Sequence, residues 1–144
     1  MDIEQIKKLS EKFRRAIERC ERSELPLSLE NFPIGSCSDA STLLGTYLKD
    51  NGFGDFHLVK GRRGEGAGLE THFWLEKENL IVDITADQFD GIKEDIIITS
   101  TDSEWHNSFT KIILREADYR QIVAMDVRRN LDAVYDFILS NIEI

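Results

Sequence analysis

Apolar residues recur at helical spacing in three stretches of the chain. In residues 2–23, in the stretch that follows Ser36 and in residues 127–142 they stand three or four positions apart, which puts them on one face of a helix. The second stretch ends at Asn51-Gly52, a pair typical of helix ends. The apolar positions of the three stretches are Ile3, Ile6, Phe13, Ala16, Ile17 and Cys20; Ala40, Leu43, Leu44, Tyr47 and Leu48; and Leu131, Val134, Tyr135, Ile138 and Leu139. The pattern predicts three amphipathic helices.

The middle of the chain has the short apolar runs that are typical of strands. We predict strands at residues 56–59, 71–76, 80–85, 96–99 and 112–114. Residues 24–36 contain both prolines and predict an extended connector without helix. The glycine-rich residues 61–68 lack a phosphate-loop pattern and predict a flexible hairpin connection or lid. Helices followed by a meandering sheet and a last helix indicate one α+β domain over residues 1–144.

The composition is that of an acidic globular protein. Of the 144 residues 41% are hydrophobic and 31% charged, and the formal net charge is −9. Negative charge repels phosphate backbones and anionic lipids, so we expect no nucleic-acid or membrane partner. No apolar run approaches the roughly 20 residues of a membrane span, and the charged N-terminal stretch lacks the apolar centre of a signal peptide. We expect a cytoplasmic protein, with export as an effector without a classical signal left open.

The two cysteines differ in their surroundings. Neither Cys20 nor Cys37 belongs to a CxxC pair, and three histidines and two scattered cysteines do not supply a closed zinc site, so we expect no metal and no cofactor. Without a secretion signal we also expect no structural disulfide. Cys20 lies on the apolar stripe of the first helix and is interpreted as a packing residue. Cys37 is the cysteine that invites a test for nucleophilic catalysis.

Cys37 is predicted to be the first residue of the second helix. Ser36 is a good N-cap, and Asp39 stands where a carboxylate can return a bond to the cap. The free N–H groups and positive dipole end of a helix stabilise a thiolate, the form of cysteine that attacks. The same N–H groups can also bind the oxyanion of a tetrahedral intermediate. The position therefore favours a nucleophile, against the alternative of an accidental first-turn residue.

A predicted hairpin supplies the other chemical groups. If its turn centres on Lys77-Glu78, His72 faces Asp83, and Phe73 faces Val82 on the apolar side. A register shift of two residues makes the first pair diagonal but keeps both side chains on one face. The carboxylate can then orient the imidazole, and the other ring nitrogen can serve Cys37, as in a catalytic triad.

The remaining histidines are interpreted as structural. His57 lies in a predicted strand, and His106 follows Trp105 in an irregular stretch. His57 is the substitute base if the hairpin is misread.

The segments FPIGSCSDASTLL, THFWLE and IVDITADQF, over about residues 32–89, resemble papain-like and transglutaminase-like cysteine enzymes. The pattern is closest to bacterial members of the protein glutamine deamidase type. The resemblance implies a helix that begins at the nucleophile and packs on an antiparallel sheet. It also implies Cys37 as nucleophile, His72 as base and Asp83 as the third member, and Trp74 matches an aromatic residue often found just after the histidine.

The resemblance also separates the possible reactions. Papain-type peptidases place an oxyanion glutamine shortly before the cysteine, and the interval LENFPIGS has none, which disfavours a peptidase. Gln88 and Ser38 are further candidates for lining the site. We expect a hydrolase that forms a Cys37 thioester, first of all a protein glutamine deamidase, whose partner is a protein that presents a glutamine or amide. Alternatives are a cysteine peptidase, a transglutaminase, an inactive binding module of the same fold, and an interaction protein with an acidic surface.

Overall fold

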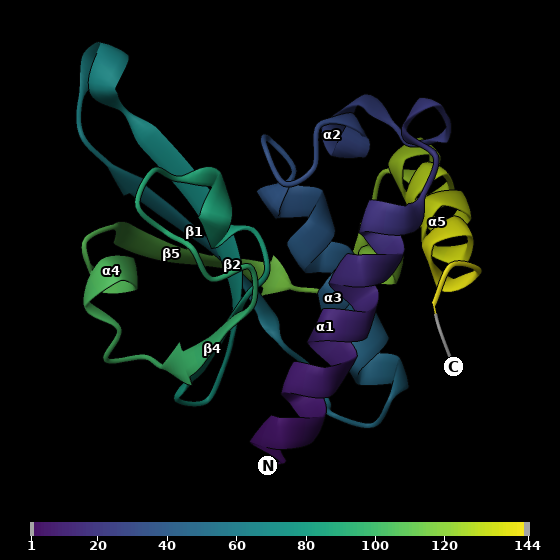
Figure 1. Cartoon of the computed structure of the whole chain (residues 1–144), viewed down its shortest axis with the longest axis horizontal. Coiled ribbons are helices and arrows are strands. Elements are labelled where there is room, and N and C mark those ends of the chain that lie inside the picture. The colour runs from purple at the N-terminus through teal and green to yellow at the C-terminus, as the bar shows by residue number, and fades with distance from the viewer. Residues whose placement is uncertain (1, 143–144) are drawn as a thin grey trace.

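Three long helices form one side of the protein and an antiparallel sheet forms the other (Figure 1). The computed structural model describes residues 2–142. The helices are α1 (Ile3–Arg19), α2 (Leu27–Glu30), α3 (Cys37–Asp50), α4 (Glu104–Asn107) and α5 (Met125–Leu139). The strands are β1 (His57–Arg63), β2 (Glu70–Lys77), β3 (Leu80–Asp83), β4 (Ile97–Ser100) and β5 (Thr110–Glu116). Short 3-10 turns lie at Arg22–Glu24, Gly66–Gly68, Ala86–Gln88 and Tyr119–Gln121. The protein is therefore of the α+β class.

Within residues 2–142 the sheet has five strands in the order β4-β3-β2-β1-β5, and every neighbouring pair is antiparallel. β1 and β2 pair along their whole length, from His57 with Glu76 to Arg63 with Glu70. Their connection contains residues 64–68 of the glycine-rich segment, whose first three residues belong to β1, and it forms the tip of an arm that projects at the upper left of Figure 1. The predicted hairpin connection is confirmed.

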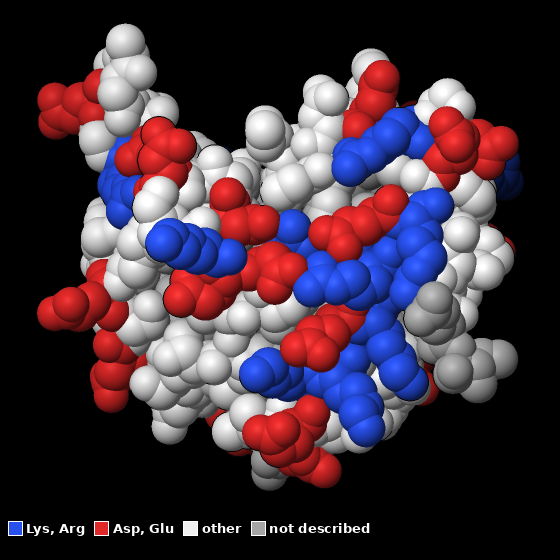
Figure 2. Space-filling view, in the orientation of Figure 1, with Lys and Arg blue, Asp and Glu red and all other residues white. Residues whose placement is uncertain are grey.

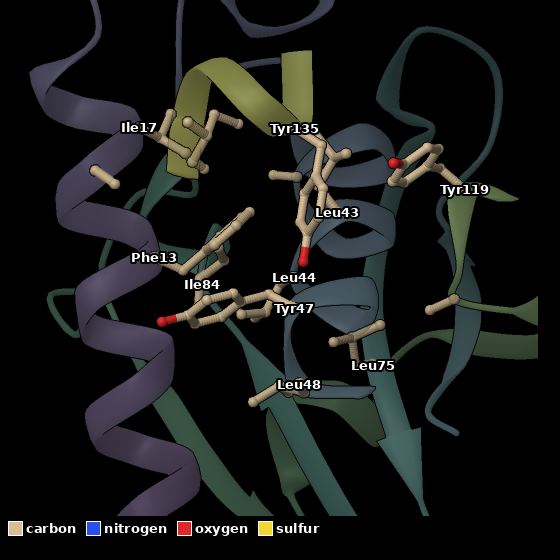
Figure 3. Close-up of a cluster of buried hydrophobic side chains, with 14 of the residues drawn as sticks. Phe13, Ile17, Leu43, Leu44, Tyr47, Leu48, Leu75, Ile84, Tyr119 and Tyr135 are labelled. Carbon is tan, nitrogen blue, oxygen red and sulfur yellow. The ribbon is translucent and has the colours of Figure 1, made fainter. Parts of the chain in front are cut away.

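The core fills the space between the sheet and the helices. α3 lies on β1 and β2, α1 packs on α3, and α5 packs on α1. Figure 3 shows side chains from these elements meeting, among them Phe13 of α1, Leu44 of α3 and Leu75 of β2. Each of these three side chains is completely buried. The apolar stripes predicted for the helices are thus largely the buried ones, although Ile3 is half exposed.

Several local predictions need correction. The first helix ends at Arg19, before the predicted residue 23, and the connector 24–36 is not free of helix because α2 lies within it. Pro26 does not prevent this helix, since it precedes the first helical residue, where a missing N–H costs nothing. β1 runs on to Arg63, well past the predicted residue 59.

The face of the sheet away from α3 is covered by an aromatic cluster. We define it as Trp74, Phe89, Trp105 and Phe109, which pack with Val59 and Ile81. The rings lie over Gly61, where an added Cβ would come within 2.8 Å of Trp74 and Phe109. The sheet is therefore buried on both sides at this point, and the residues between β3 and β5 form the second cover.

Charges of both signs are interleaved over the front of the molecule (Figure 2). On this view basic side chains run along α1, with acidic side chains among and beside them. Among residues 2–142 no helix has the length and apolar character needed to span a membrane.

Candidate active site

Cys37 is the first residue of α3, as predicted, and only 8% of its surface is exposed. Ser36 occupies the N-cap position but does not cap the helix with its side chain; its hydroxyl donates to the Ile34 carbonyl at 3.3 Å. The predicted reciprocal cap with Asp39 is therefore wrong. As a result, the Ser36 side chain leaves the first-turn N–H groups of α3 available to other acceptors.

The start of α3 lies beside an open stretch of the β2 edge. β3 pairs with β2 from Leu75 to Lys77, and no pairing with β3 extends to Phe73 within the described residues. The backbone N–H of Phe73 donates to the Cys37 sulfur, and its carbonyl accepts from the Ser41 hydroxyl at 3.5 Å. The start of α3 thus lies where a longer β3 would pair with β2. This brings Cys37 of α3 close to His72, whose side chain lies on the other face of the sheet.

His72 and Asp83 meet on the face covered by the aromatic cluster. His72 Nε2 lies 2.8 Å from Asp83 Oδ2, and both side chains are completely buried. The register is shifted by two residues from the prediction, since Val82 pairs with Leu75 and not with Phe73. The reason is the turn: β2 runs to Lys77, and Glu78 adopts a left-handed conformation (φ 55°). The shift by an even number leaves both side chains on one face.

His72 and Asp83 shift each other's pKa in opposite directions. Burial alone would raise the pKa of Asp83, but the charge of His72 and hydrogen bonds from two histidines lower it to about 2. Burial likewise disfavours the imidazolium, yet the charge and hydrogen bond of Asp83 raise the pKa of His72 to about 9. Asp83 Oδ1 accepts the Thr85 N–H at 3.1 Å, so each carboxylate oxygen has a donor. The geometry favours a carboxylate bound to an imidazolium.

The Cys37 thiol is acidified by this pair. Burial opposes its ionisation, but the hydrogen bond and charge of His72, the Phe73 amide and the Gln88 side chain together lower the pKa of Cys37 below its usual value. Nε2 of His72 is bound to Asp83, so the hydrogen bond to the sulfur is assigned to Nδ1, which also lies 3.2 Å from the Gln88 amide nitrogen. The arrangement favours a thiolate–imidazolium pair.

Gln88 reaches Cys37 and His72 from the 3-10 turn after β3. Its Nε2 lies 3.2 Å from His72 Nδ1, and its Oε1 accepts the Gly35 N–H at 3.4 Å. Gly35 has a positive φ of 69° and stands two residues before Cys37. The side-chain amide of Gln88 thus lies among the loop before α3, the sulfur and the imidazole.

A buried arginine of α1 holds the segment that carries Gln88. Arg14 is 4% exposed, and its guanidinium donates to both carboxylate oxygens of Asp87 at 2.7 and 2.8 Å. It also donates to the carbonyls of Ile84 at 2.6 Å and Asp95 at 3.0 Å. Nothing in the periodicity of the first helix distinguishes this arginine from its exposed neighbours, so the sequence did not reveal it.

The other sequence candidates lie at varying distances from this centre. Trp74 is buried with its ring centroid 5.6 Å from that of His72, and its Nε1 donates to Glu76 at 2.8 Å. Ser38 is half-buried in the first turn of α3, where its carbonyl accepts from the Thr42 hydroxyl. His57 is exposed at the start of β1, opposite Glu76, so it does not replace His72.

His106 is part of the site, contrary to its interpretation as a structural residue outside it. It is buried on α4, and its Nε2 lies 2.8 Å from Asp83 Oδ2, the oxygen that also contacts His72. Its position follows from tertiary packing. The only sequence signal is Ser103 three residues earlier, which caps α4 and contacts the ring of His106.

Within residues 2–142 no group of three or more His, Cys, Asp or Glu side chains is arranged to hold a metal ion. The chemical groups gathered here are a thiol, two imidazoles, a carboxylate and a carboxamide. Comparison with protein-family models, curated proteins and solved structures gave no significant match.

Proposed function

We propose that this protein is a cysteine-dependent hydrolase that attacks a carboxamide carbonyl. The observation that carries the proposal is the His72–Asp83 contact, together with the lowered pKa of Cys37, to which His72 contributes a hydrogen bond and its charge. The thiolate attacks the carbonyl carbon, and the oxygen that becomes negative is stabilised by the Cys37 N–H and the Gln88 amide. His72 gives its Nδ1 proton to the leaving nitrogen, the C–N bond breaks, and a Cys37 thioester remains. Water then gives a proton to His72 and attacks the thioester, and the C–S bond breaks.

The substrate we propose is a glutamine side chain of a partner protein, with ammonia as the leaving group. Cys37 is only 8% exposed, so a side-chain amide entering end-on reaches the sulfur more readily than a main-chain peptide, which needs an open groove on both sides of the scissile bond. The resemblance to glutamine deamidases points in the same direction. Contacts with the partner would supply much of the transition-state positioning, and free glutamine would be a poor substrate.

The test is to express the protein and its Cys37→Ala variant in the same host cells and compare host peptides by mass spectrometry. Glutamines that gain about 1 Da only with the active protein support deamidation. New chain termini would identify a peptidase, and cross-linked or amine-adducted glutamines a transglutaminase. Identical peptide sets, together with an unreactive Cys37 thiol, would leave only a binding module.

A further inference from the structure

A second histidine contacts the carboxylate that orients His72. His106 Nε2 and His72 Nε2 each lie 2.8 Å from the same oxygen of Asp83. Since an ionised carboxylate only accepts, both ring nitrogens carry hydrogen. The other nitrogen of His106, Nδ1, lies 2.7 Å from the Ser103 hydroxyl, which also accepts the backbone N–H of His106 at 3.3 Å. In a neutral His106 the hydroxyl donates to Nδ1, so hydrogen bonds run in one direction from Ser103 to Asp83.

The surroundings of His106 make this contact specific. Its ring packs at 4.9 Å between the rings of Trp74 and Trp105, so it has no contact with bulk solvent at the Asp83 end. A residue that only filled this space would be apolar, because an imidazole brings two polar nitrogens that must be satisfied. Here both nitrogens have partners, and one of them is the carboxylate of the proposed active site.

We propose that His106 is a positioning residue for the reaction: it fixes the Asp83 carboxylate so that Oδ2 stays directed at His72 Nε2. The inference rests on the proposed function, because it assigns His106 a role through Asp83 and His72. Oδ1 of Asp83 is held by the Thr85 N–H and Oδ2 by the two histidines, so the carboxylate has one orientation. Without the His106 donor the carboxylate would be free to turn away from His72 Nε2, and the cation beside Cys37 would be less stabilised.

The other charged groups nearby do not replace this effect. His72 faces Cys37 from α3 and Asp83 from β3, and the amide of Gln88 is uncharged. Arg63 of β1 lies over the outer side of the aromatic cluster, 4.1 Å from the Phe109 ring centroid, where Glu70 pairs with it. The buried donors to Asp83 are the two histidines and the Thr85 N–H. His106 is the one of these that is neither the base nor part of the backbone.

The experiment measures the rate at which iodoacetamide alkylates Cys37 from pH 5 to pH 10, in a Cys20→Ala background (pH range chosen to bracket the usual thiol pKa of about 8.5). This rate follows the thiolate and needs no substrate. We expect His106→Leu to raise the pH of half-maximal rate by about one unit, because the cation that acidifies Cys37 is weakened. His106→Gln, whose Nε2 can still donate to Asp83, should keep the profile of the parent protein. Ser103→Ala should shift the profile in the same direction as His106→Leu, and it decides the matter if that variant does not fold.

The outcomes are distinct. A folded His106→Leu, or Ser103→Ala in its place, with the parent profile would reduce His106 to a packing residue while the proposed function stands. A His106→Gln profile shifted as far as that of His106→Leu would also overturn the inference, because the donated hydrogen would not be what matters. A parent profile like that of an ordinary thiol, unchanged by His72→Ala, would remove the thiolate–imidazolium pair and with it both proposals.

Discussion

A carboxylate without solvent is stable only when donors surround it, and Asp83 meets this condition through His72, His106 and the Thr85 N–H. The donors in turn are fixed by the buried charge. This mutual dependence also affects Cys37, because the hydrogen bond and charge of His72 lower the pKa of its thiol. The chemical reactivity of one side chain is therefore a property of several residues that lie far apart in the sequence.

Cys37 should be the reactive thiol and Cys20 the inert one. Cys20 is 3% exposed at the end of α1, its sulfur donates to the Ala16 carbonyl at 3.3 Å, and burial raises its pKa. The pKa of Cys37 is lowered, so far more thiolate is present at neutral pH. Brief treatment with iodoacetamide followed by peptide mapping measures the difference. Preferential modification of Cys20 in the folded protein would contradict the assignment.

The stability of a Cys37→Ala variant should depend on pH through His72. In the parent protein the thiolate and the imidazolium together hold as many protons as a neutral thiol and imidazole, so their contributions largely cancel. With alanine at position 37 the pKa of His72 is raised by Asp83 alone: the stabilising effect is complete below about pH 6.5 and is lost as the pH rises through this raised pKa, which is lower than in the parent protein because the sulfur no longer contributes. We expect the free energy of unfolding to fall by on the order of 1 kcal/mol over this range.

Urea denaturation at several pH values measures this loss. The control is Cys37→Ala/His72→Gln, in which the amide can still donate to Asp83 but does not titrate. The control should show little slope over the same range. Equal slopes in the two variants would mean that His72 is not the group that titrates.

Residues of the candidate site could be predicted only where the neighbouring sequence indicates their position. A cysteine at a helix start and a histidine and an aspartate on one face of a hairpin follow from spacing, and the structure brings Cys37, His72 and Asp83 together. Their catalytic roles stay a prediction. His106 and Arg14 were not foreseen because their partners are 23 and at least 70 residues away in the sequence, a distance over which periodicity carries no information.

At the level of elements, the early end of β3 shapes the site. Because β3 stops at Asp83, the Phe73 backbone of β2 is open to α3. A strand that continued would pair with this edge and separate Cys37 from His72. The same stop places Asp83 at a strand end, where the chain turns away, so that Gln88 can approach His72 and Arg14 can bind the Ile84 carbonyl. The proposed reaction at Cys37 therefore requires that β3 be short.

Elements were predicted better than the way they join. The three helices and five strands exist near the predicted residues because each has a strong apolar period. The hairpin register was wrong by two residues, since it depends on a left-handed Glu78, a conformation uncommon outside glycine. The missed α2 has four residues, too few for a periodic pattern to appear.

Arg14→Met should destabilise the protein and disturb the site together. The change leaves two backbone carbonyls and the Asp87 carboxylate without their buried donor. Removing one partner of a buried ion pair costs about 3–5 kcal/mol. The Gln88 segment should loosen as well, so alkylation of Cys37 at neutral pH should slow.

The matched control is Arg15→Met on the same helix. Arg15 bonds Glu18 and Asp95 at the surface, and its side chain is 42% exposed. Exposed pairs contribute less than about 1 kcal/mol. Denaturant titration of both variants gives the comparison, and an Arg14→Met loss no larger than that of Arg15→Met would show that the buried contacts do not hold the segment.

For the whole molecule, the site and the main core occupy different places. The core lies between the helices and one face of the sheet (Figure 3), while His72 and Asp83 lie on the other face among the aromatic rings. Cys37 is the residue that connects the two sides.

This separation predicts that stability and chemistry respond to different substitutions. Cys37→Ala removes one sulfur at a helix start and an ionised group from a buried place, so the free energy of unfolding should change by no more than about 1 kcal/mol. Leu44→Ala opens a cavity at a fully buried position of the same helix and should cost about 2–5 kcal/mol. Deamidation should disappear in the first variant and persist in the second at temperatures where it is folded.

Urea denaturation near pH 6, where His72 stays protonated in both variants, tests the predicted stabilities. The host-peptide comparison tests the predicted activities. A loss of stability in Cys37→Ala as large as that in Leu44→Ala would show that the sulfur holds the helix to the sheet, and glutamine conversion that survives in Cys37→Ala would assign the chemistry to another residue.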